Sequence, residues 1–384
     1  MNKKIKVKNR LIGEGEPIFL TAEIGVAHSG DFEIAKMLLY KAKEAGCDGA
    51  DMFMTTGDDF YHYNVPLEEY KVDNKNIGSI DLWKKNSFDK DQWRELFKFA
   101  EEIDITLYLT PLDSPSIDMA VELGSPMLNI NSNDLNNSLY LKHIAKKKIP
   151  VTVHDINATL AEVEGAVCML IDAGCKDIIL LHSTQETGDA EVLYETANLN
   201  VMNTYKSAFS SRGVMVGCVE HTTSKFLIYA VAALKPVLIS KHLLYKHAEN
   251  VADNVISFEA EEMKEIIRNV RYVESALGSG SNIVVCDKNG NQPDEDIKRR
   301  KVIVARRNIK KSKVIVQDDL AVKRPGNVGG LHPWFVNFLC GARAKVNIKN
   351  NTILNLNMFE DFKDIPYKPY NLEKRYYRQK RKGA

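Results

Sequence analysis

The chain has 384 residues, of which 44% are hydrophobic and 27% are charged, and its formal net charge is +1. This is the composition of an ordinary globular protein, and the balanced charge gives no global field that would favour nucleic acid or a membrane surface. No run of about 18 apolar residues is present, so we expect no transmembrane helix. The N-terminus lacks the apolar core of a signal peptide, and the six cysteines form no Cys-x-x-Cys pair, which favours reduced thiols in a cytoplasmic protein.

From residue 18 to residue 278, short apolar runs alternate with segments of helical spacing. Residues 1–16 predict a β ribbon that closes the floor of the domain. Asp31 and Gly46 bracket the first helix as N-cap and C-cap. The polar stretch 55–86 is expected to be a lid or binding loop, in which Tyr61, Tyr63 and Tyr70 either stack on a sugar or pack on the domain. Eight strand–helix pairs indicate a (β/α)8 barrel over residues 1–278, with a doubly wound sheet as the alternative.

Four histidines follow apolar runs that read as strands: His154, His182, His221 and His242. The C-terminal ends of barrel strands converge on one mouth, so these side chains are candidates for a shared metal or catalytic site. Buried, hydrogen-bonded histidines are the structural alternative.

The composition changes after residue 278. Residues 279–299 are rich in turn-forming residues and predict a linker. Residues 300–362 predict a small β-rich domain, in which the phrase Asn-Ile-Lys occurs at 308–310 and again at 347–349. A β-clip-like fold with two related turns would explain this repeat. Residues 363–384 form a basic tail, interpreted as a solvated terminus.

The chain resembles the N-acetylneuraminate (sialic acid) synthase family over nearly its whole length. The resemblance rests on Ala22-Glu23-Ile24-Gly25, Leu109-Thr110-Pro111, Glu220-His221-Thr222, Lys241-His242 and Lys323-Arg324-Pro325-Gly326. It implies a TIM barrel followed by an antifreeze-like (SAF) domain.

The resemblance also implies an activity, in which phosphoenolpyruvate condenses with an N-acyl-mannosamine-type sugar to give a nonulosonic 2-keto acid. It places a divalent metal, Mn²⁺ or Mg²⁺, on His221 and His242, with Asp253 positioning metal-bound water and sugar. Glu23 and Asp134 match carboxylates near the sugar. Arg324 matches an arginine that reaches into the partner's barrel, which implies a domain-swapped homodimer.

The departures from the family concern the phosphate of the donor. Asp51 and Asn129 stand where the family has lysines, while His154, Gln185 and Val219 replace its serine, asparagine and serine. Thr110 and Ser132 remain as hydroxyl contacts. Because a carboxylate beside a phosphate repels it by several kcal/mol at low effective dielectric, the cradle is expected to be largely lost on the wall opposite the metal pair.

Three functions therefore stay open. In the first, the enzyme binds the same donor through other residues, namely Lys241, Lys246 or Arg324. In the second, it uses another, phosphate-free donor in an aldol or lyase reaction. In the third, it is a non-catalytic sugar-binding paralogue. His154 is a candidate ligand, cation or base. Asp51 is a candidate ligand or acid/base, with a solvated loop carboxylate as the alternative, and His182 has either a role at the metal or a packing role.

Overall fold

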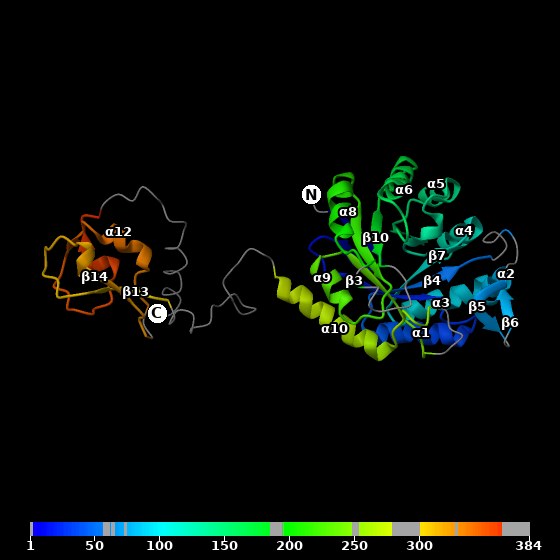
Figure 1. Cartoon of the computed structure of the whole chain (residues 1–384), viewed down its shortest axis with the longest axis horizontal. Helices are drawn as coiled ribbons and strands as arrows, with labels where there is room; N and C mark the ends of the chain where they lie inside the picture. The colour runs from blue at the N-terminus through cyan, green and yellow to red at the C-terminus, as the bar shows by residue number, and fades with distance from the viewer. Residues whose placement is uncertain are drawn as a thin grey trace. The chain divides into compact units, whose positions relative to one another are not determined.

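The computed structural model describes residues 3–56, 62, 66–72, 75–184, 194, 196–247, 253–278, 300–326 and 329–362. The chain divides into two compact units, Met1–Gly278 and Ser279–Ala384, and each is considered by itself (Figure 1). The predicted linker 279–299 and tail 363–384 lie outside the described residues.

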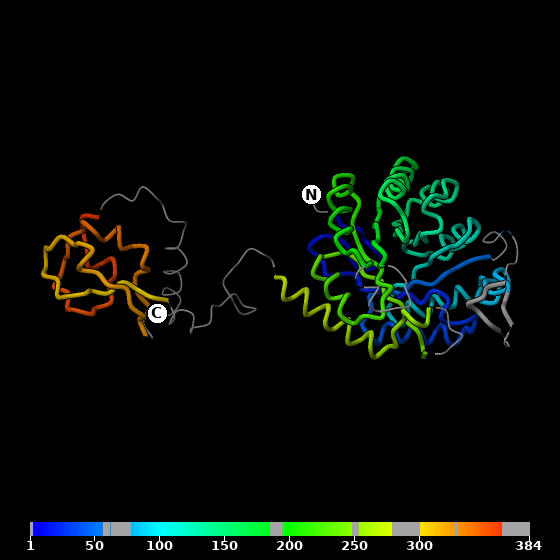
Figure 2. The backbone as a smooth tube through the Cα atoms, in the orientation of Figure 1, coloured from blue at the N-terminus to red at the C-terminus, as the bar shows by residue number. Residues whose placement is uncertain are grey.

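The first unit is a closed parallel barrel, which confirms the (β/α)8 prediction and excludes the doubly wound sheet. Its eight strands, in the order in which they neighbour one another, are β3 (Phe19–Gly25), β4 (Gly49–Met54), β7 (Thr106–Pro111), β8 (Leu128–Ile130), β9 (Val151–His154), β10 (Ile178–Ser183), β11 (Met215–Glu220) and β12 (Leu238–His242). The last strand pairs with the first, so the tube in Figure 2 passes once around the barrel and closes there.

Helices follow the strands around the outside of the barrel. They are α1 (Phe32–Ala45), α3 (Lys90–Glu102), α4 (Ser114–Glu122), α5 (Ser138–Ala145), α6 (Leu160–Asp172), α8 (Val201–Phe209), α9 (Leu227–Ala233) and α10 (Ala260–Leu277). The predicted caps of α1 are present, because the Asp31 carboxylate accepts hydrogen bonds from two backbone N–H groups of the first turn and Gly46 is left-handed. No helix in the described part of the chain has the length and apolar character needed to cross a bilayer.

A hairpin of β1 (Lys4–Val7) and β2 (Arg10–Gly13) supplies apolar side chains to the barrel interior, as the sequence predicts. Ile5, Val7 and Ile12 are buried in one cluster with inward-facing residues of the strands, among them Phe19 and Tyr108. This cluster fills the lower part of the barrel, and the polar groups of the mouth lie above it.

The stretch 55–86 is more regular than the predicted loop. It contains the hairpin β5 (Pro66–Val72) and β6 (Lys75–Gly78), followed by α2 (Ser79–Lys85). Tyr61 and Tyr63 lie outside the described residues, as does the side chain of Tyr70. Pairing of two short strands explains why the segment can be long without being an unstructured lid.

The second unit has two related halves around the repeated turn. Its strands are β13 (Val302–Ala305), β14 (Leu320–Lys323), β15 (Arg343–Ala344) and β16 (Phe359–Glu360), with α12 (Val336–Leu339) beside them. Ile309 and Ile348 of the two Asn-Ile-Lys phrases bridge in antiparallel fashion. The Asn308 side chain accepts from Asn350 N–H at 2.7 Å and the Asn347 side chain from Lys311 N–H at 2.8 Å, so each turn closes the other.

The hairpin's role in the barrel gives a first prediction. Ile12→Ala should lower the free energy of unfolding by about 2–5 kcal/mol, because it empties a fully buried site in the barrel interior. Its neighbour Leu11, which is 44% exposed, supplies the matched control, and Leu11→Ala should change stability by less than about 0.5 kcal/mol. Urea denaturation of the two variants measures both values, and equal losses would show that the hairpin does not plug the barrel.

Candidate metal centre at the barrel mouth

Alternation along each strand decides which side chains enter the barrel. On β10, Ile179 and Leu181 belong to the interior cluster, whereas Leu180 packs in the layer between strands and helices. The same parity on β12 turns Leu238 inward and Ile239 outward. When this alternation is continued towards the strand ends, the side chains of Glu23, Asp51, His154 and His242 point into the mouth of the barrel.

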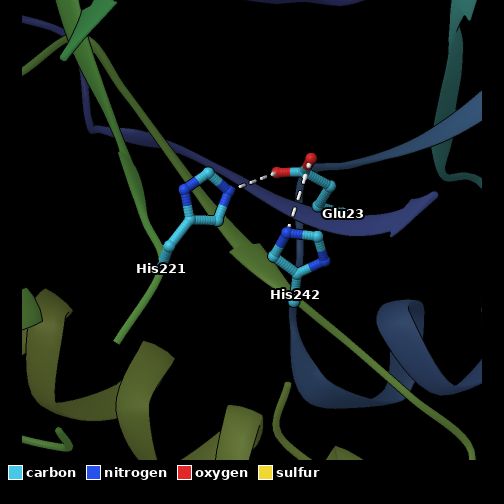
Figure 3. Close-up of side chains that lie close together, drawn as sticks. All are labelled: Glu23, His221 and His242. Carbon is cyan, nitrogen blue, oxygen red and sulfur yellow. Dashed lines mark ion pairs between the residues drawn. The ribbon is translucent and has the colours of Figure 1, made fainter. Parts of the chain in front are cut away.

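Two of these residues, Glu23 of β3 and His242 of β12, meet His221, which follows β11, in one group (Figure 3). His221 Nε2 lies 4.0 Å from Glu23 Oε2, and His242 Nε2 lies 3.6 Å from Glu23 Oε1. The two imidazole rings have centroids 5.0 Å apart. Such separations exceed hydrogen-bond length and suit atoms that share one ion, since ligand atoms about 2.1 Å from a metal lie roughly 3–3.5 Å from one another.

The chemistry of the three donors also fits a divalent cation. All three side chains are buried. Burial, together with the positive charges of His154 and Lys241, lowers the pKa of His221 to about 3. Burial also lowers the pKa of His242 well below its ordinary value. Both rings are therefore neutral at physiological pH, which is the form that binds a metal, and the carboxylate completes a two-histidine, one-carboxylate set.

Neighbouring groups fix the orientation of these donors. The Thr184 hydroxyl accepts from the His221 backbone N–H at 2.7 Å, and the Thr184 carbonyl lies 3.2 Å from His221 Nδ1. The Ser240 hydroxyl donates to Glu23 at 3.2 Å. Asp253 lies at 4.0 Å from His242 Nδ1, on the side of the ring away from Glu23. The structure thus brings His221 and His242 together, and Asp253 lies beside the other ring nitrogen of His242.

Glu23 is the donor that sequence reasoning did not assign to the metal, because the resemblance placed it near the sugar. The strand register supplies the missing signal. In the parallel pairing of β12 with β3, Glu23 is the partner of His242. Two inward-facing residues at one register level are neighbours, so a carboxylate is brought beside the histidine pair.

The Asp51 side chain forms a buried polar network on the adjoining strands. Its Oδ2 accepts from the Thr110 hydroxyl at 2.6 Å and from the Asn129 amide at 3.0 Å, and the Thr152 hydroxyl donates to Asn129 at 2.6 Å. Burial raises the pKa of Asp51 to about 7, against the lowering effect of the Thr110 and Asn129 hydrogen bonds. Asp51 is 1% exposed, so it is not a solvated loop carboxylate. The hydrogen of the Thr110 hydroxyl is therefore used in the bond to Asp51.

Asp51 lies on the strand next to that of Glu23, two strands away from His242. Asp51 is the register partner of Glu23 on the adjacent strand, so the two carboxylates are neighbours in the mouth. His154 is 2% exposed, and its charge lowers the pKa values of both His221 and His242. Burial lowers the pKa of His154 itself to about 4, against the attraction of Asp155. Asp51 and His154, two of the residues that replace the family's phosphate contacts, therefore point into the same barrel mouth as the metal group.

Two residues expected at the mouth face outward instead. His182 pairs in register with Cys218 of the outer layer, and its ring bonds Asp155 at 3.0 Å and the Ala197 carbonyl at 2.9 Å. Burial opposes protonation of this ring, yet the hydrogen bond and charge of Asp155 raise the pKa of His182. Of the two roles considered for His182, these contacts correspond to the packing role. Lys241 also faces the outer layer, where it pairs with Glu220 at 2.8 Å.

The remaining predicted site residues lie elsewhere. Asp134 is buried after β8, where Asn137 donates to it at 2.8 Å and burial raises its pKa. Ser132 begins the same short 3-10 turn and is partly exposed. Arg324 is exposed on the second unit, Lys246 is exposed after β12, and Gln185 lies outside the described residues.

The fold and site define a (β/α)8-barrel protein with a candidate divalent-metal centre and a small appended β domain. Residues 38–282 match the NeuB family, and residues 300–360 match the SAF domain. The chain belongs to the NeuB family, as the sequence resemblance indicated.

The similarity to individual relatives covers nearly the whole chain. An uncharacterized protein of Methanocaldococcus jannaschii is 32% identical, covering 91% of this chain and 97% of the relative. The N,N'-diacetyllegionaminic acid synthase of Legionella pneumophila is 29% identical, over 92% and 97%. The human N-acetylneuraminate-9-phosphate synthase is 28% identical, over 89% and 92%. The N-acetylneuraminic acid synthetase structure from Leptospira borgpetersenii matches with a TM-score of 0.66 at 24% identity, covering 75% of this chain and 94% of that one, and it supports the fold.

The buried Asp51 carboxyl predicts a pH-dependent stability. Its pKa in the folded chain, about 7, lies above the ordinary value of 3.8, so the folded state loses stability as pH rises from about 4 through 7. Asp51→Asn cannot ionise and keeps an acceptor for Thr110 and Asn129. Its stability relative to the parent should therefore improve between pH 4.5 and pH 8, by up to roughly 3 kcal/mol at 1.36 kcal/mol per pKa unit.

Asp113→Asn is the control of opposite sign. The Asp113 carboxylate accepts hydrogen bonds from Thr55, Thr56 and Ser116, which lower its pKa although burial acts to raise it. That variant should lose stability relative to the parent as pH rises from 3 to 6. Denaturant unfolding at several pH values measures both variants, and a pH-independent difference for Asp51→Asn would contradict the assignment.

Proposed function

We propose that this protein is a metal-assisted synthase that joins an enol pyruvate donor to the aldehyde of an N-acyl amino sugar, forming a nonulosonic 2-keto acid. The observation that carries the proposal is the buried group of Glu23, His221 and His242 at the mouth of a NeuB-family barrel. Relatives named as legionaminic, N-acetylneuraminate-9-phosphate and pseudaminic acid synthases support the reaction class.

The residues would divide the work as follows. Glu23, His221 and His242 would hold Mn²⁺ or Mg²⁺, and the bound ion would supply Lewis-acid polarisation of a carbonyl oxygen. Asp253, whose carboxylate lies 4.0 Å from His242 Nδ1, would orient a water or sugar hydroxyl beside the centre. With phosphoenolpyruvate as donor, the new bond joins its C3 to the aldehyde carbon, water adds at C2 and phosphate leaves.

A second candidate is favoured by the Asp51 network. Thr110 and Asn129 already donate hydrogen bonds to Asp51. Asp51 also places a carboxyl group at a position where binding of a phosphate would require a positively charged side chain. Lys241, an alternative phosphate contact, is directed to Glu220 in the outer layer. A phosphate-free donor such as pyruvate, adding to the sugar aldehyde in an aldol reaction with no leaving group, suits this lining better. A sugar-binding paralogue without catalysis is the third reading.

The proposal extends to the assembly and the compartment. Arg324 would reach the acyl group of the sugar in the barrel of a partner subunit, which requires a homodimer. The site is expected to work in the cytoplasm, where its small-molecule substrates are made.

The metal part of the proposal predicts a loss of ion binding. His221→Ala and His242→Ala should each abolish saturable Mn²⁺ binding in a calorimetric titration that saturates the parent protein, because each removes one of three ligands. His182→Gln alters a histidine that faces the outer layer and should leave the Mn²⁺ affinity within about threefold of the parent. A parent that binds no divalent ion, or His221→Ala binding as tightly as the parent, contradicts the proposal.

The donor is decided by product analysis. The purified protein with Mn²⁺ is offered a panel of N-acyl hexosamines with either phosphoenolpyruvate or pyruvate, and inorganic phosphate and 2-keto acid products are followed. Phosphate release coupled to sugar consumption is the expected result for the first candidate. Product from pyruvate alone would establish the second candidate, and no product with either donor would leave a binding protein.

A further inference from the structure

Lys241 is a buried cation directly behind the candidate metal ligands. Its side chain is 2% exposed. The ammonium group donates to the Glu220 carbonyl at 3.0 Å and also to the Thr222 carbonyl. These two carbonyls belong to the residues on either side of His221, so one side chain fixes the backbone from which that imidazole projects.

The same ammonium group is tied to the other histidine. Lys241 precedes His242 in the chain, and its Nζ lies 4.6 Å from the centre of the Phe258 ring, a cation–π distance. The Phe258 backbone N–H donates to the His242 carbonyl at 3.0 Å. The positions of His221 and His242 are therefore both set around one buried charge.

Glu220 supplies the counter-charge. It is fully buried, and its carboxylate lies 2.8 Å from Lys241 Nζ, at angles outside hydrogen-bond geometry. The directed hydrogen bonds of Lys241 thus go to the two backbone carbonyls, while Glu220 contributes charge attraction. A buried ion pair is commonly no more stabilising than apolar residues of the same volume, so stability alone gives no reason for this pair.

We propose that Lys241 is a positioning residue for the metal centre, holding the backbones of His221 and His242 so that their ring nitrogens face Glu23. This inference rests on the proposed metal site and deepens it. In this role Lys241 acts through the carbonyls of Glu220 and Thr222.

The test compares Mn²⁺ affinity in three variants of the full chain. Lys241→Met removes the two carbonyl hydrogen bonds and should weaken Mn²⁺ binding at least about tenfold, the usual cost of losing an outer support of a metal ligand. Glu220→Gln keeps those bonds and should change the affinity less than about threefold. The double variant Glu220→Gln/Lys241→Met leaves no unpaired buried charge, so it should unfold at a higher temperature than Lys241→Met while still binding Mn²⁺ weakly.

Arg271→Met is the matched control for general destabilisation. Arg271 pairs with Asp48 at 2.9 Å in another part of the barrel, so its loss should lower thermal stability without changing Mn²⁺ affinity. Parent-like Mn²⁺ affinity in the double variant, or a loss in Glu220→Gln equal to that in Lys241→Met, overturns the positioning role. Failure of the parent protein to bind Mn²⁺ refutes the metal site itself, whereas failure of this inference alone leaves ion binding intact in the parent and the variants.

Discussion

The alternation of side chains along eight closed parallel strands is the constraint on which this site depends. Each strand offers every second residue to the interior, and the floor is filled by apolar residues of the N-terminal hairpin. Most polar groups of the described interior therefore meet above this apolar floor. That restriction selects Glu23, Asp51 and His242 for one cavity and sends Lys241 and His182 to the outer layer, although all five occur near strand ends.

Burial then sets the chemistry of the selected groups. The interior offers little water to solvate charge, so the histidines at the mouth are held neutral and Asp51 is held close to half-protonated at neutral pH. Neutral imidazoles are good metal ligands, and a carboxyl that protonates readily avoids strong repulsion from the neighbouring Glu23. One physical cause, desolvation, thus accounts both for the neutral imidazoles and for the raised pKa of Asp51.

Much of this arrangement could be predicted from the sequence. The barrel, the floor hairpin and the caps of α1 follow from periodicity and capping residues, whereas the pair His221 and His242 is singled out by the family resemblance. The sequence located the ends of the strands, but it did not show which of the residues at each end faces the barrel interior. The wrong placement of His182 and Lys241 has this origin. His182 and Ser183 differ by a single position, and only the pairing with β11 shows which of them faces inward. The adjacency of Asp51 and Glu23 likewise depends on register between strands, which local patterns do not encode.

The polar groups of the mouth fall into two sets, which under the proposed function would recognise the sugar aldehyde and the enol pyruvate donor separately. The metal donors come from β11, β12 and β3, whereas the network around Asp51 comes from β4, β7, β8 and β9. Under the proposed function, a bound ion serves the aldehyde, and that requirement is independent of the leaving group on the donor. A change from lysine to Asp51 can then alter which donor is accepted while the aldehyde end keeps its chemistry. The two groups adjoin at the register pair Glu23 and Asp51, so under the proposed function the protonation of Asp51 would set how much negative charge stands beside the metal ligands.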